Sequence, residues 1–414
     1  MLNMLNKIRK REPKFFSNIG IREYPRKRIC TLHKKPQNIF VAILIILTIS
    51  SCDNTFSIFQ SIGQEKKQLG AELFKAATVR AMGSDGTNYY ALMSKVVYKP
   101  IAGSSWQVLP LPVGDDTENK DIDYFAPGLA SDGSTIFVAK ADSNNNLKDI
   151  YSSSDSGISW TAMDAKKDID TAIGSDIKVD WLKCENKTLF VAVHGSAGYS
   201  LFYYDVASTS FKNAFDSTIS SLSEPLVDIV WDGLSSPATY WLISSSKVYS
   251  GAEGSIAEDT SAANNPALSN GLVGIASDGA GRILVSRSDG IIYSYSSGSW
   301  TNFTAKSSTA LGPLILLNQP STSKRILVAR GASTLGYMEY DEASPAIYEN
   351  GKDFVSTSQS IYNSTVRAKQ VEGFWQPASD PNTLFILLAT GTEGSYSLYR
   401  NTYSEGAWGG WIAE

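Results

Sequence analysis

The chain has 414 residues, of which 43% are hydrophobic and 19% charged, a composition typical of a folded protein rather than a disordered one. The first 51 residues contain eleven Lys and Arg but only two acidic residues, and subtracting these from the totals of 37 and 41 leaves 26 basic and 39 acidic residues. The remaining chain therefore has a net charge of about −13, which argues against nucleic acid and anionic lipid headgroups as partners.

The first predicted element is a short apolar segment that follows a basic stretch. Lys34 and Lys35 precede the uncharged run IFVAILIILTI at 39–49, and small residues then lead to Cys52. As a helix this run spans only ~16 Å, about half of a bilayer core, so it is too short for a permanent transmembrane helix. Its length and flanks fit the core of an export signal peptide. The preceding residues 1–33 are either an extended basic region of that signal or a stretch upstream of the true start.

The order of basic residues, apolar run, small residues and cysteine resembles a bacterial lipoprotein signal, with Ile49-Ser50-Ser51-Cys52 in the place of the lipobox. The family usually has Leu where Ile49 stands and Gly or Ala where Ser51 stands, so the match is permissive. The resemblance implies cleavage before Cys52, a diacylglycerol on its sulfur, and a lipid anchor in a membrane of the bacterial cell envelope, facing the periplasm or the cell surface. The alternative is a buried apolar segment that happens to end in Cys.

This interpretation divides the chain into a basic region with the signal peptide (1–51), a lipidated N-terminus with its tether (52–75) and a folded domain (76–414). Apolar residues at helical spacing over 64–77 predict a short helix just before the folded domain.

A repeated turn sequence organises the folded domain. The aspartates of successive Asp-Gly turns are separated by 47, 100 and 46 residues, so the period is about 48. The 100-residue spacing is about twice this period, so it predicts an additional unit between the two turns, over 179–195. A further unit fits 311–331. Ser-Asp-Gly, or a close variant of it, lies between strand-like runs at 84–86, 131–133, 232–233, 277–279 and 379–381.

Each unit repeats the same order of elements, which is clearest at 274–303: a strand, an Asp-Gly turn, a strand, a turn, a Tyr-rich strand, a Gly turn and an aromatic strand. Asp-Gly between alternating runs is a strong hairpin signal, because Gly readily adopts the positive φ of a tight turn. Four short strands in about 48 residues resemble one blade of a β-propeller. We therefore expect an all-β fold of seven four-stranded antiparallel blades, beginning near Val79, Gly128, Val179, Leu226, Leu272, Leu311 and Val371.

The predicted fourth strand is not equally clear in every blade. The fourth and sixth units lack a clear aromatic residue in the fourth strand, whereas the C-terminal sequence GGWIAE supplies a fourth strand for the seventh through Trp411. Separate β-sandwiches are the alternative architecture, but they would expose more strand edges and need long linkers.

The stretch SSSDSGISW at 152–160 joins the third and fourth strands of the second predicted blade. Its Ser153, Asp155, Gly157 and Trp160 match S-x-D-x-G-x-x-W and resemble the Asp-box, or BNR repeat, of sialidases and many other propellers. We expect Asp155 to accept backbone N–H groups of its own turn, Gly157 to be left-handed, and Trp160 to be buried over the turn. Because the box recurs in proteins of unrelated chemistry, it indicates a structural role.

The resemblance to sialidases raises the alternative of a carbohydrate-active hydrolase. That family binds the substrate carboxylate with an arginine triad, and the nearest match to its first arginine motif, at Arg80, departs at every flanking position. A Ser-His-Asp or metal-dependent mechanism would need His194, the only histidine after the predicted cleavage site. It lies at a strand end without a nucleophile motif or a second histidine at ligand spacing, so we expect a surface histidine and no catalytic residues.

We also expect no metal and no cofactor other than the covalent lipid on Cys52. The three cysteines are too few and too scattered for a disulfide framework or a zinc site. The oxygen-rich stretch 142–146 begins like a calcium loop, but Leu147 and Ser153 stand where an EF-hand needs Gly and Glu. Phosphate-binding and dinucleotide-binding sequences are absent.

Acidic residues are concentrated in the segments that connect the predicted blades. Lys-Asp-Ile-Asp occurs twice, 47 residues apart, in the connectors that enter blades two and three. Long loops on a rigid scaffold often bind partners, so these connectors predict a binding rim for a basic protein patch or divalent cations. The alternative is that the charges only keep the domain soluble. The rim comprises Asp121, Asp123, Asp168 and Asp170.

Together these features predict a lipid-anchored envelope propeller that acts as a non-catalytic binding module for a protein or carbohydrate partner. The hydrolase is one alternative, and a scaffold or assembly factor for other envelope proteins is another.

Overall fold

The chain divides into two compact units, 1–61 and 62–414, and the computed structural model describes residues of the second unit only. Cys52, the predicted signal segment and most of the predicted helix over 64–77 lie outside the described residues, and the described end of that helix, 73–75, is a turn. Among the described residues, no helix is long and apolar enough to cross a membrane. The structure describes residues 73–75, 77–93, 95–110, 127–234, 236–260, 271–304, 309–319, 325–331, 335–341, 366, 369–389 and 396–414.

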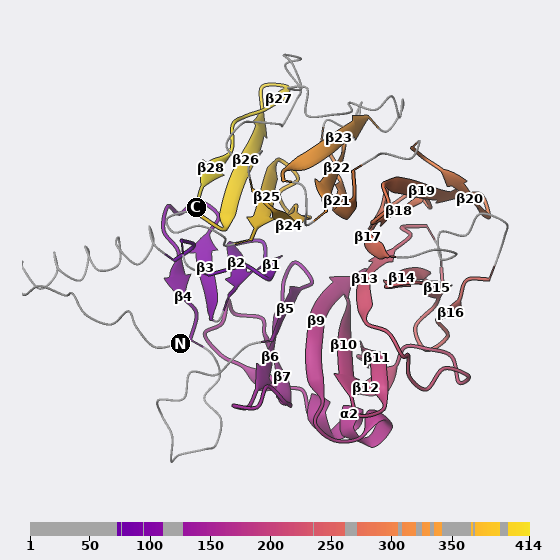
Figure 1. The fold of residues 1–414 in the computed structure, drawn as a ribbon. Coiled ribbons are helices and arrows are strands. Elements are labelled where there is room, and N and C mark those ends of the chain that lie inside the picture. The colour runs from indigo at the N-terminus through magenta and orange to yellow at the C-terminus, as the bar shows by residue number, and fades with distance from the viewer. Residues whose placement is uncertain are drawn as a thin grey trace, which may run out of the picture. The chain divides into compact units, whose positions relative to one another are not determined.

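Seven antiparallel sheets follow one another along the described chain (Figure 1). The first contains β1 (Ala81–Ser84), β2 (Asn88–Leu92), β3 (Val96–Pro100) and β4 (Gln107–Val108). The second contains β5 (Gly128–Ser131), β6 (Ile136–Ala141), β7 (Leu147–Ser153) and β8 (Thr161–Ala162). The third contains β9 (Lys178–Glu185), β10 (Thr188–Gly195), β11 (Gly198–Asp205) and β12 (Ser210–Asn213). The fourth contains β13 (Leu226–Trp231), β14 (Tyr240–Ser244), β15 (Val248–Gly251) and β16 (Ala257–Glu258).

The remaining three sheets follow the same order. The fifth contains β17 (Leu272–Ser277), β18 (Ile283–Arg287), β19 (Ile291–Ser296) and β20 (Ser299–Asn302). The sixth has three described strands, β21 (Leu311–Leu316), β22 (Arg325–Arg330) and β23 (Tyr337–Asp341). The seventh contains β24 (Val371–Trp375), β25 (Thr383–Leu388), β26 (Leu398–Ser404), β27 (Ala407–Trp408) and β28 (Ile412–Ala413).

The sheets are the blades of a seven-bladed β-propeller, as the repeat predicts. In the first six sheets, and from β24 to β27 in the seventh, consecutive described strands pair as a meander. The first strand of each sheet contacts the first strand of the next, from β1 to β24. The ring closes where the Tyr89 hydroxyl in the first blade donates a 2.7 Å hydrogen bond to Asp380 in the seventh. In place of a single strand through Trp411, two short strands on either side of it, β27 and β28, pair with β26.

The Asp-Gly turns have the conformation that their sequence requires. In the first blade, Oδ1 of Asp85 accepts the backbone N–H groups of Thr87 and Asn88 at 2.8 and 2.7 Å, and Gly86 has φ +86°. Asp132 makes the same two contacts in the second blade. A side chain at Gly86 would be strained, which explains why Gly follows Asp at this turn.

The hydrophobic core lies between neighbouring blades rather than in one central cluster. Residues of β6, β7, β9 and β10 form one such layer, and residues of the first and seventh blades form another. Phe74, which is fully buried before the first blade, contacts Trp106 at a ring-centroid distance of 5.1 Å. Its carbonyl also accepts the N–H of Ser397 in the seventh blade, so this segment joins the two ends of the ring.

One connector differs from the prediction of a loop. Residues Ala165–Ile173 form helix α2, because Ala165, Ile169 and Ile173 recur at four-residue spacing and are buried against the second and third blades. The second copy of the duplicated Lys-Asp-Ile-Asp sequence, at 167–170, therefore lies on a helix, where Asp168 contacts Phe211 and Asp170 contacts Lys166.

Candidate ligand-binding pocket

The alternation of strand direction gives the propeller two distinct faces. Turns between first and second strands, and between third and fourth strands, lie on one face, which we call the turn face. Turns between second and third strands, and the segments that enter each first strand, lie on the other, which we call the connector face. On the turn face, the Ser156 hydroxyl of the second blade donates a 2.7 Å hydrogen bond to Asp85 of the first.

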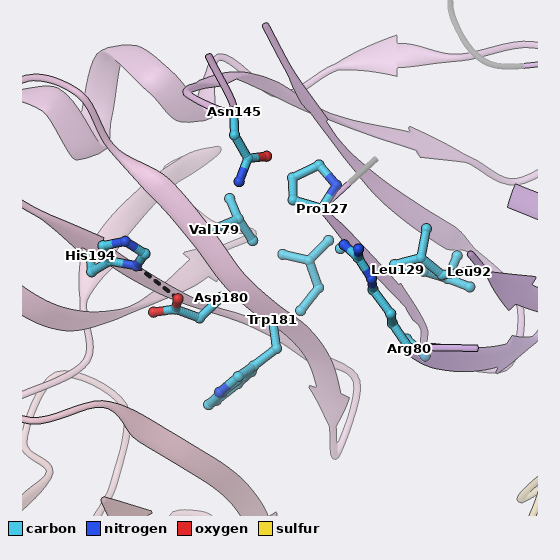
Figure 2. A pocket seen from close by; sticks show the side chains of 12 residues that line it. Arg80, Leu92, Pro127, Leu129, Asn145, Val179, Asp180, Trp181 and His194 are labelled. Atoms are coloured by element: carbon cyan, nitrogen blue, oxygen red, sulfur yellow. Dashed lines mark hydrogen bonds and ion pairs between the residues drawn. The ribbon is translucent and has the colours of Figure 1, made fainter. Parts of the chain in front are cut away.

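A cavity of about 200 Å³ opens on the connector face where the first three blades meet (Figure 2). Arg80 precedes β1, Asn145 lies in the turn between β6 and β7, and Asp180 and His194 belong to β9 and β10. Apolar side chains form most of the remaining wall: Ala81, Leu92, Pro127, Leu129, Val179 and Leu182.

Close approach of β5 to β9 shapes the floor of this cavity. A Cβ atom at Gly128 would lie 2.6 Å from Cγ of Leu182, so no larger residue fits there without displacing the wall. The glycine that begins the second blade thus allows the first strands of two blades to meet beside the cavity.

Asn145 is held by a rigid turn. Its N–H donates a 2.9 Å hydrogen bond to the carbonyl of Asp142, and Oδ1 of Asp142 accepts the N–H groups of Asn144 and Asn146. These bonds hold the pKa of Asp142 below its usual range. Asn145 has φ +66°, a left-handed conformation that Asn tolerates better than most residues. Its side-chain Oδ1 is buried and accepts no hydrogen bond from the described residues.

Asp180 and His194 form a pair at one side of the cavity. Nδ1 of His194 lies 2.7 Å from Oδ1 of Asp180. The register of β9 and β10 pairs Val193 with Val179 and Ala192 with Trp181, so Asp180 is the extra residue of a bulge, which redirects its side chain. Burial raises the pKa of Asp180, and the nearby His194 partly opposes that shift.

Arg80 approaches the cavity from the first blade (Figure 2). Its backbone N–H donates a 2.8 Å hydrogen bond to the carbonyl of Leu92, which fixes the start of β1, while the residue itself is exposed. A carbohydrate-active hydrolase would be favoured if Arg, Tyr and Glu side chains converged at the opening of this cavity. Of the described residues that line the cavity, none is Tyr or Glu.

The four residues of the Asp-box sequence lie on the turn face, away from the cavity. Asp155 accepts hydrogen bonds from the Ser153 hydroxyl at 2.7 Å and from the Ser159 N–H at 2.9 Å. Ser153 in turn accepts the N–H of Gly157, which has φ +83°. Trp160 is half-buried rather than buried, and its indole donates to the carbonyl of Pro110 at 3.1 Å. Trp160 thus packs against the core layer between the first two blades, as expected, but it is only partly buried there.

The predicted acidic rim is described only in part. Asp121 and Asp123 lie outside the described residues. Asp168 accepts the N–H of Phe211 at 2.8 Å, so it anchors α2 to β12, and Asp170 pairs with Lys166 one helical turn away. Both carboxylates thus have structural partners within the second and third blades.

Sequence reasoning did not identify Asn145 or the Asp180–His194 pair. The sequence argues against 142–146 as a calcium loop and predicts a surface position for His194, whereas His194 is half-buried and paired with Asp180. The Asn-rich turn was the only local signal, because Asn at a tight turn is compatible with a left-handed conformation.

Comparison with known proteins identifies the fold. No protein-family profile and no curated protein matches the chain. A structure of YCF48 bound to D1 peptide is 12% identical, with a TM-score of 0.51, and the match covers 80% of this chain and 95% of that one. An ancestral GH74 enzyme is 13% identical, with a TM-score of 0.56 over 82% of this chain and 47% of that one.

A GH74 xyloglucanase from Xanthomonas campestris is 12% identical, with a TM-score of 0.51 over 82% of this chain and 55% of that one. At such identities a likeness carries the architecture and not the activity. The chain is accordingly similar to binding proteins and to hydrolases alike, and what they share with it is the β-propeller.

Proposed function

We propose that the protein is a lipid-anchored propeller of the bacterial cell envelope that binds a protein partner through its connector face and catalyses no reaction. The cavity between the first three blades carries this proposal, because it combines an apolar wall with Arg80 and Asn145 on a rigid scaffold. Pockets of this kind, with a few placed polar groups, are typical of binding sites. The sequence around Cys52 supports the lipid anchor, and the acidic charge of the remaining chain disfavours nucleic acid.

The experiment is an affinity capture from detergent-solubilised envelope with variants that obstruct one face at a time. Asn144→Trp with Ala197→Trp places two bulky side chains at exposed turns of the connector face. Ile158→Trp with Val206→Trp is the matched control at exposed turns of the turn face. We expect the first pair to lose the partner and the second to retain it. Loss of the partner only with the turn-face pair would show that the connector face is not the binding face.

A hydrolase is the second candidate, and the Asp180–His194 pair is the observation that favours it. A histidine oriented by a carboxylate can take a proton from water or from a hydroxyl. Neither Ser, Thr nor Cys lines the described cavity, so the nucleophile would be water. Hydrolysis of a panel of glycosides and esters by the wild type, abolished in His194→Gln, would establish this candidate in place of the binder.

A further inference from the structure

The cavity of the connector face contains a buried hydrogen-bond acceptor. Oδ1 of Asn145 is buried and accepts no hydrogen bond from the described residues. Figure 2 shows the Asn145 side chain directed toward Pro127 and Val179, which belong to the cavity wall. Buried polar atoms in proteins are nearly always paired. A hydrogen-bond donor of a ligand would complete this pairing.

The turn at 142–146 fixes the position of this acceptor. The backbone N–H of Asn145 donates to the carbonyl of Asp142, and Oδ1 of Asp142 accepts the N–H groups of Asn144 and Asn146. These bonds hold the backbone on both sides of Asn145. The acceptor is therefore in place before a ligand arrives, so binding requires little ordering of the protein.

The charged residues of the lining favour a neutral ligand. Arg80 has an interaction of its own, and Oδ1 of Asp180 lies 2.7 Å from Nδ1 of His194. A cation in the cavity would lie near Arg80 and an anion near Asp180. An ion of either sign would therefore lose hydration and meet a like charge. The donor for Asn145 is better carried by a neutral group such as an amide N–H, which needs no contact with Arg80 or Asp180.

The wall and the volume of the cavity suit one aliphatic side chain. Leu92, Leu129 and Val179 offer an apolar surface, against which a saccharide would bury several hydroxyl groups without partners. An apolar cavity of roughly 150 Å³ can hold one benzene molecule, whereas sites for drug-sized molecules measure roughly 300–1,000 Å³. A cavity of about 200 Å³ therefore accommodates a single residue and not an extended segment.

We propose that this cavity takes one aliphatic residue from within the chain of a protein partner. Its side chain lies against Leu92, Leu129 and Val179, and its own peptide N–H donates to Oδ1 of Asn145. The inference rests on the proposed function, since it names the part of the partner that enters the connector face. An internal residue is flanked by two neutral amides, whereas a free end of a chain would bring a charge into the cavity.

The test uses neutral mimics of such a residue, measured by ligand-observed NMR on the intact wild-type protein. N-acetyl-leucinamide is the reference compound, and its size predicts a Kd on the order of 1 mM. Its ester analogue, in which oxygen replaces the N–H of the leucine, should bind about threefold to tenfold more weakly, because it has no donor for Asn145. N-acetyl-alaninamide should bind about tenfold more weakly, because it loses most of the aliphatic contact. Equal binding of amide and ester, or no binding of the amide, overturns the proposal.

Two charged analogues test the preference for a neutral ligand. N-acetyl-leucine is an anion at pH 7, and leucinamide is mostly a cation. Both should bind more weakly than N-acetyl-leucinamide, because each brings an ion into the cavity. Tighter binding of either compound overturns the proposal, since the site would then recognise a free end of a chain.

A variant and a matched control assign the N–H contact. Asn145→Gly tolerates the same φ but removes Oδ1, so it should weaken N-acetyl-leucinamide about threefold to tenfold and leave the ester unchanged. The two compounds should then bind this variant equally. Asn144→Gly truncates the exposed neighbour in the same turn, and there the difference between amide and ester should persist. A difference that persists in Asn145→Gly as well overturns the proposal.

The failure of this inference differs from the failure of the proposed function. If none of the compounds binds but the connector-face Trp variants still lose the partner, the insertion of an aliphatic residue is wrong and the binding module remains. If the compounds bind as expected and all Trp variants capture the partner equally, the proposed partner face is wrong. The occupant of the cavity is then a small neutral amide rather than a residue of that partner.

Discussion

The indole nitrogen of Trp106 in the first blade donates a 2.8 Å hydrogen bond to Oε2 of Glu414, which follows β28 in the seventh. Lys99 of β3 pairs with the same oxygen, and Nε of Arg400 lies 2.7 Å from Oε1. The side chains of Lys99 and Glu414 are only 3% and 5% exposed. Burial lowers the pKa of Lys99, and the carboxylate of Glu414 opposes that shift. This buried contact therefore joins the last blade to the first.

Glu414→Gln should lower the free energy of unfolding by about 3–5 kcal/mol, because it leaves the buried ammonium of Lys99 without its counter-charge. Urea unfolding followed by tryptophan fluorescence measures the change. Glu258→Gln is the control: Glu258 pairs with Lys247, but their side chains are 41% and 44% exposed, so little change is expected. Equal effects of the two substitutions would contradict a role for Glu414 in closing the ring.

The turn between β1 and β2 should make stability depend on pH. Burial by itself raises the pKa of Asp85, but hydrogen bonds from Tyr90, Ser156 and Thr87 outweigh it and hold the pKa well below its usual range. A carboxyl with a depressed folded-state pKa stabilises the protein above its unfolded value of about 3.9, and this contribution is lost as the pH falls further. We expect Asp85→Asn to reduce the loss of unfolding free energy below about pH 4.

Ser156→Ala should reduce the same pH dependence by a smaller amount, since it removes one of the bonds to Asp85 from the second blade. Denaturant unfolding of the three proteins at a series of acidic pH values measures the slopes. Parallel slopes for wild type and Asp85→Asn would mean that another group dominates acid unfolding.

Trp160 and Trp300 occupy the same position in their blades but differ in burial. Trp300 is 1% exposed and donates to Asp259 at 2.9 Å, whereas Trp160 is half-buried. Trp300→Ala should therefore cost about 3–5 kcal/mol of stability and Trp160→Ala about 1–2 kcal/mol. Urea midpoints of the two variants test the order, and an equal or larger loss at Trp160 would contradict it.

Cys52 is expected to carry the lipid anchor. Metabolic labelling with palmitate should mark the wild type and Cys184→Ser, but not Cys52→Ser. Cys184 is the appropriate control, because burial raises the pKa of its thiol well above the usual range and keeps it unreactive. Intact-mass analysis that finds an unacylated chain retaining residues 1–51 would contradict the prediction.

The sequence by itself determined the number of blades and, for five of the seven, the residue at which the first strand begins; Val79 precedes β1 and Val179 is the second residue of β9. The predicted starts at Gly128, Leu226, Leu272, Leu311 and Val371 coincide with the first residues of β5, β13, β17, β21 and β24. This information is local, because an Asp-Gly turn and the alternation of apolar residues specify a hairpin from a few neighbouring positions. The C-terminal sequence also predicts a last strand for the seventh blade near Trp411, where the structure has β27 before this residue and β28 after it.

Local patterns were less informative where a blade departs from the repeat. The fourth unit lacks an aromatic residue in its last strand, and Ile256 takes that place by bridging to Phe215 of the third blade. The charged residues of 165–173 suggest an exposed connector, so the sequence analysis does not predict helix α2, although Ala165, Ile169 and Ile173 recur at helical spacing. Burial against two blades, rather than propensity, stabilises this helix.

Only the tertiary structure decided which side chains form the candidate site. Arg80, Asn145 and His194 are separated by tens of residues in the chain and meet because the first three blades pack side by side. Asp180 contacts His194 because a bulge in β9 redirects its side chain. The local sequence does not indicate this one-residue shift of strand register. The contact between Trp106 and Glu414 likewise spans 308 positions. Such contacts depend on how blades are placed in the ring, and the turn sequences that define each blade carry no information about that placement.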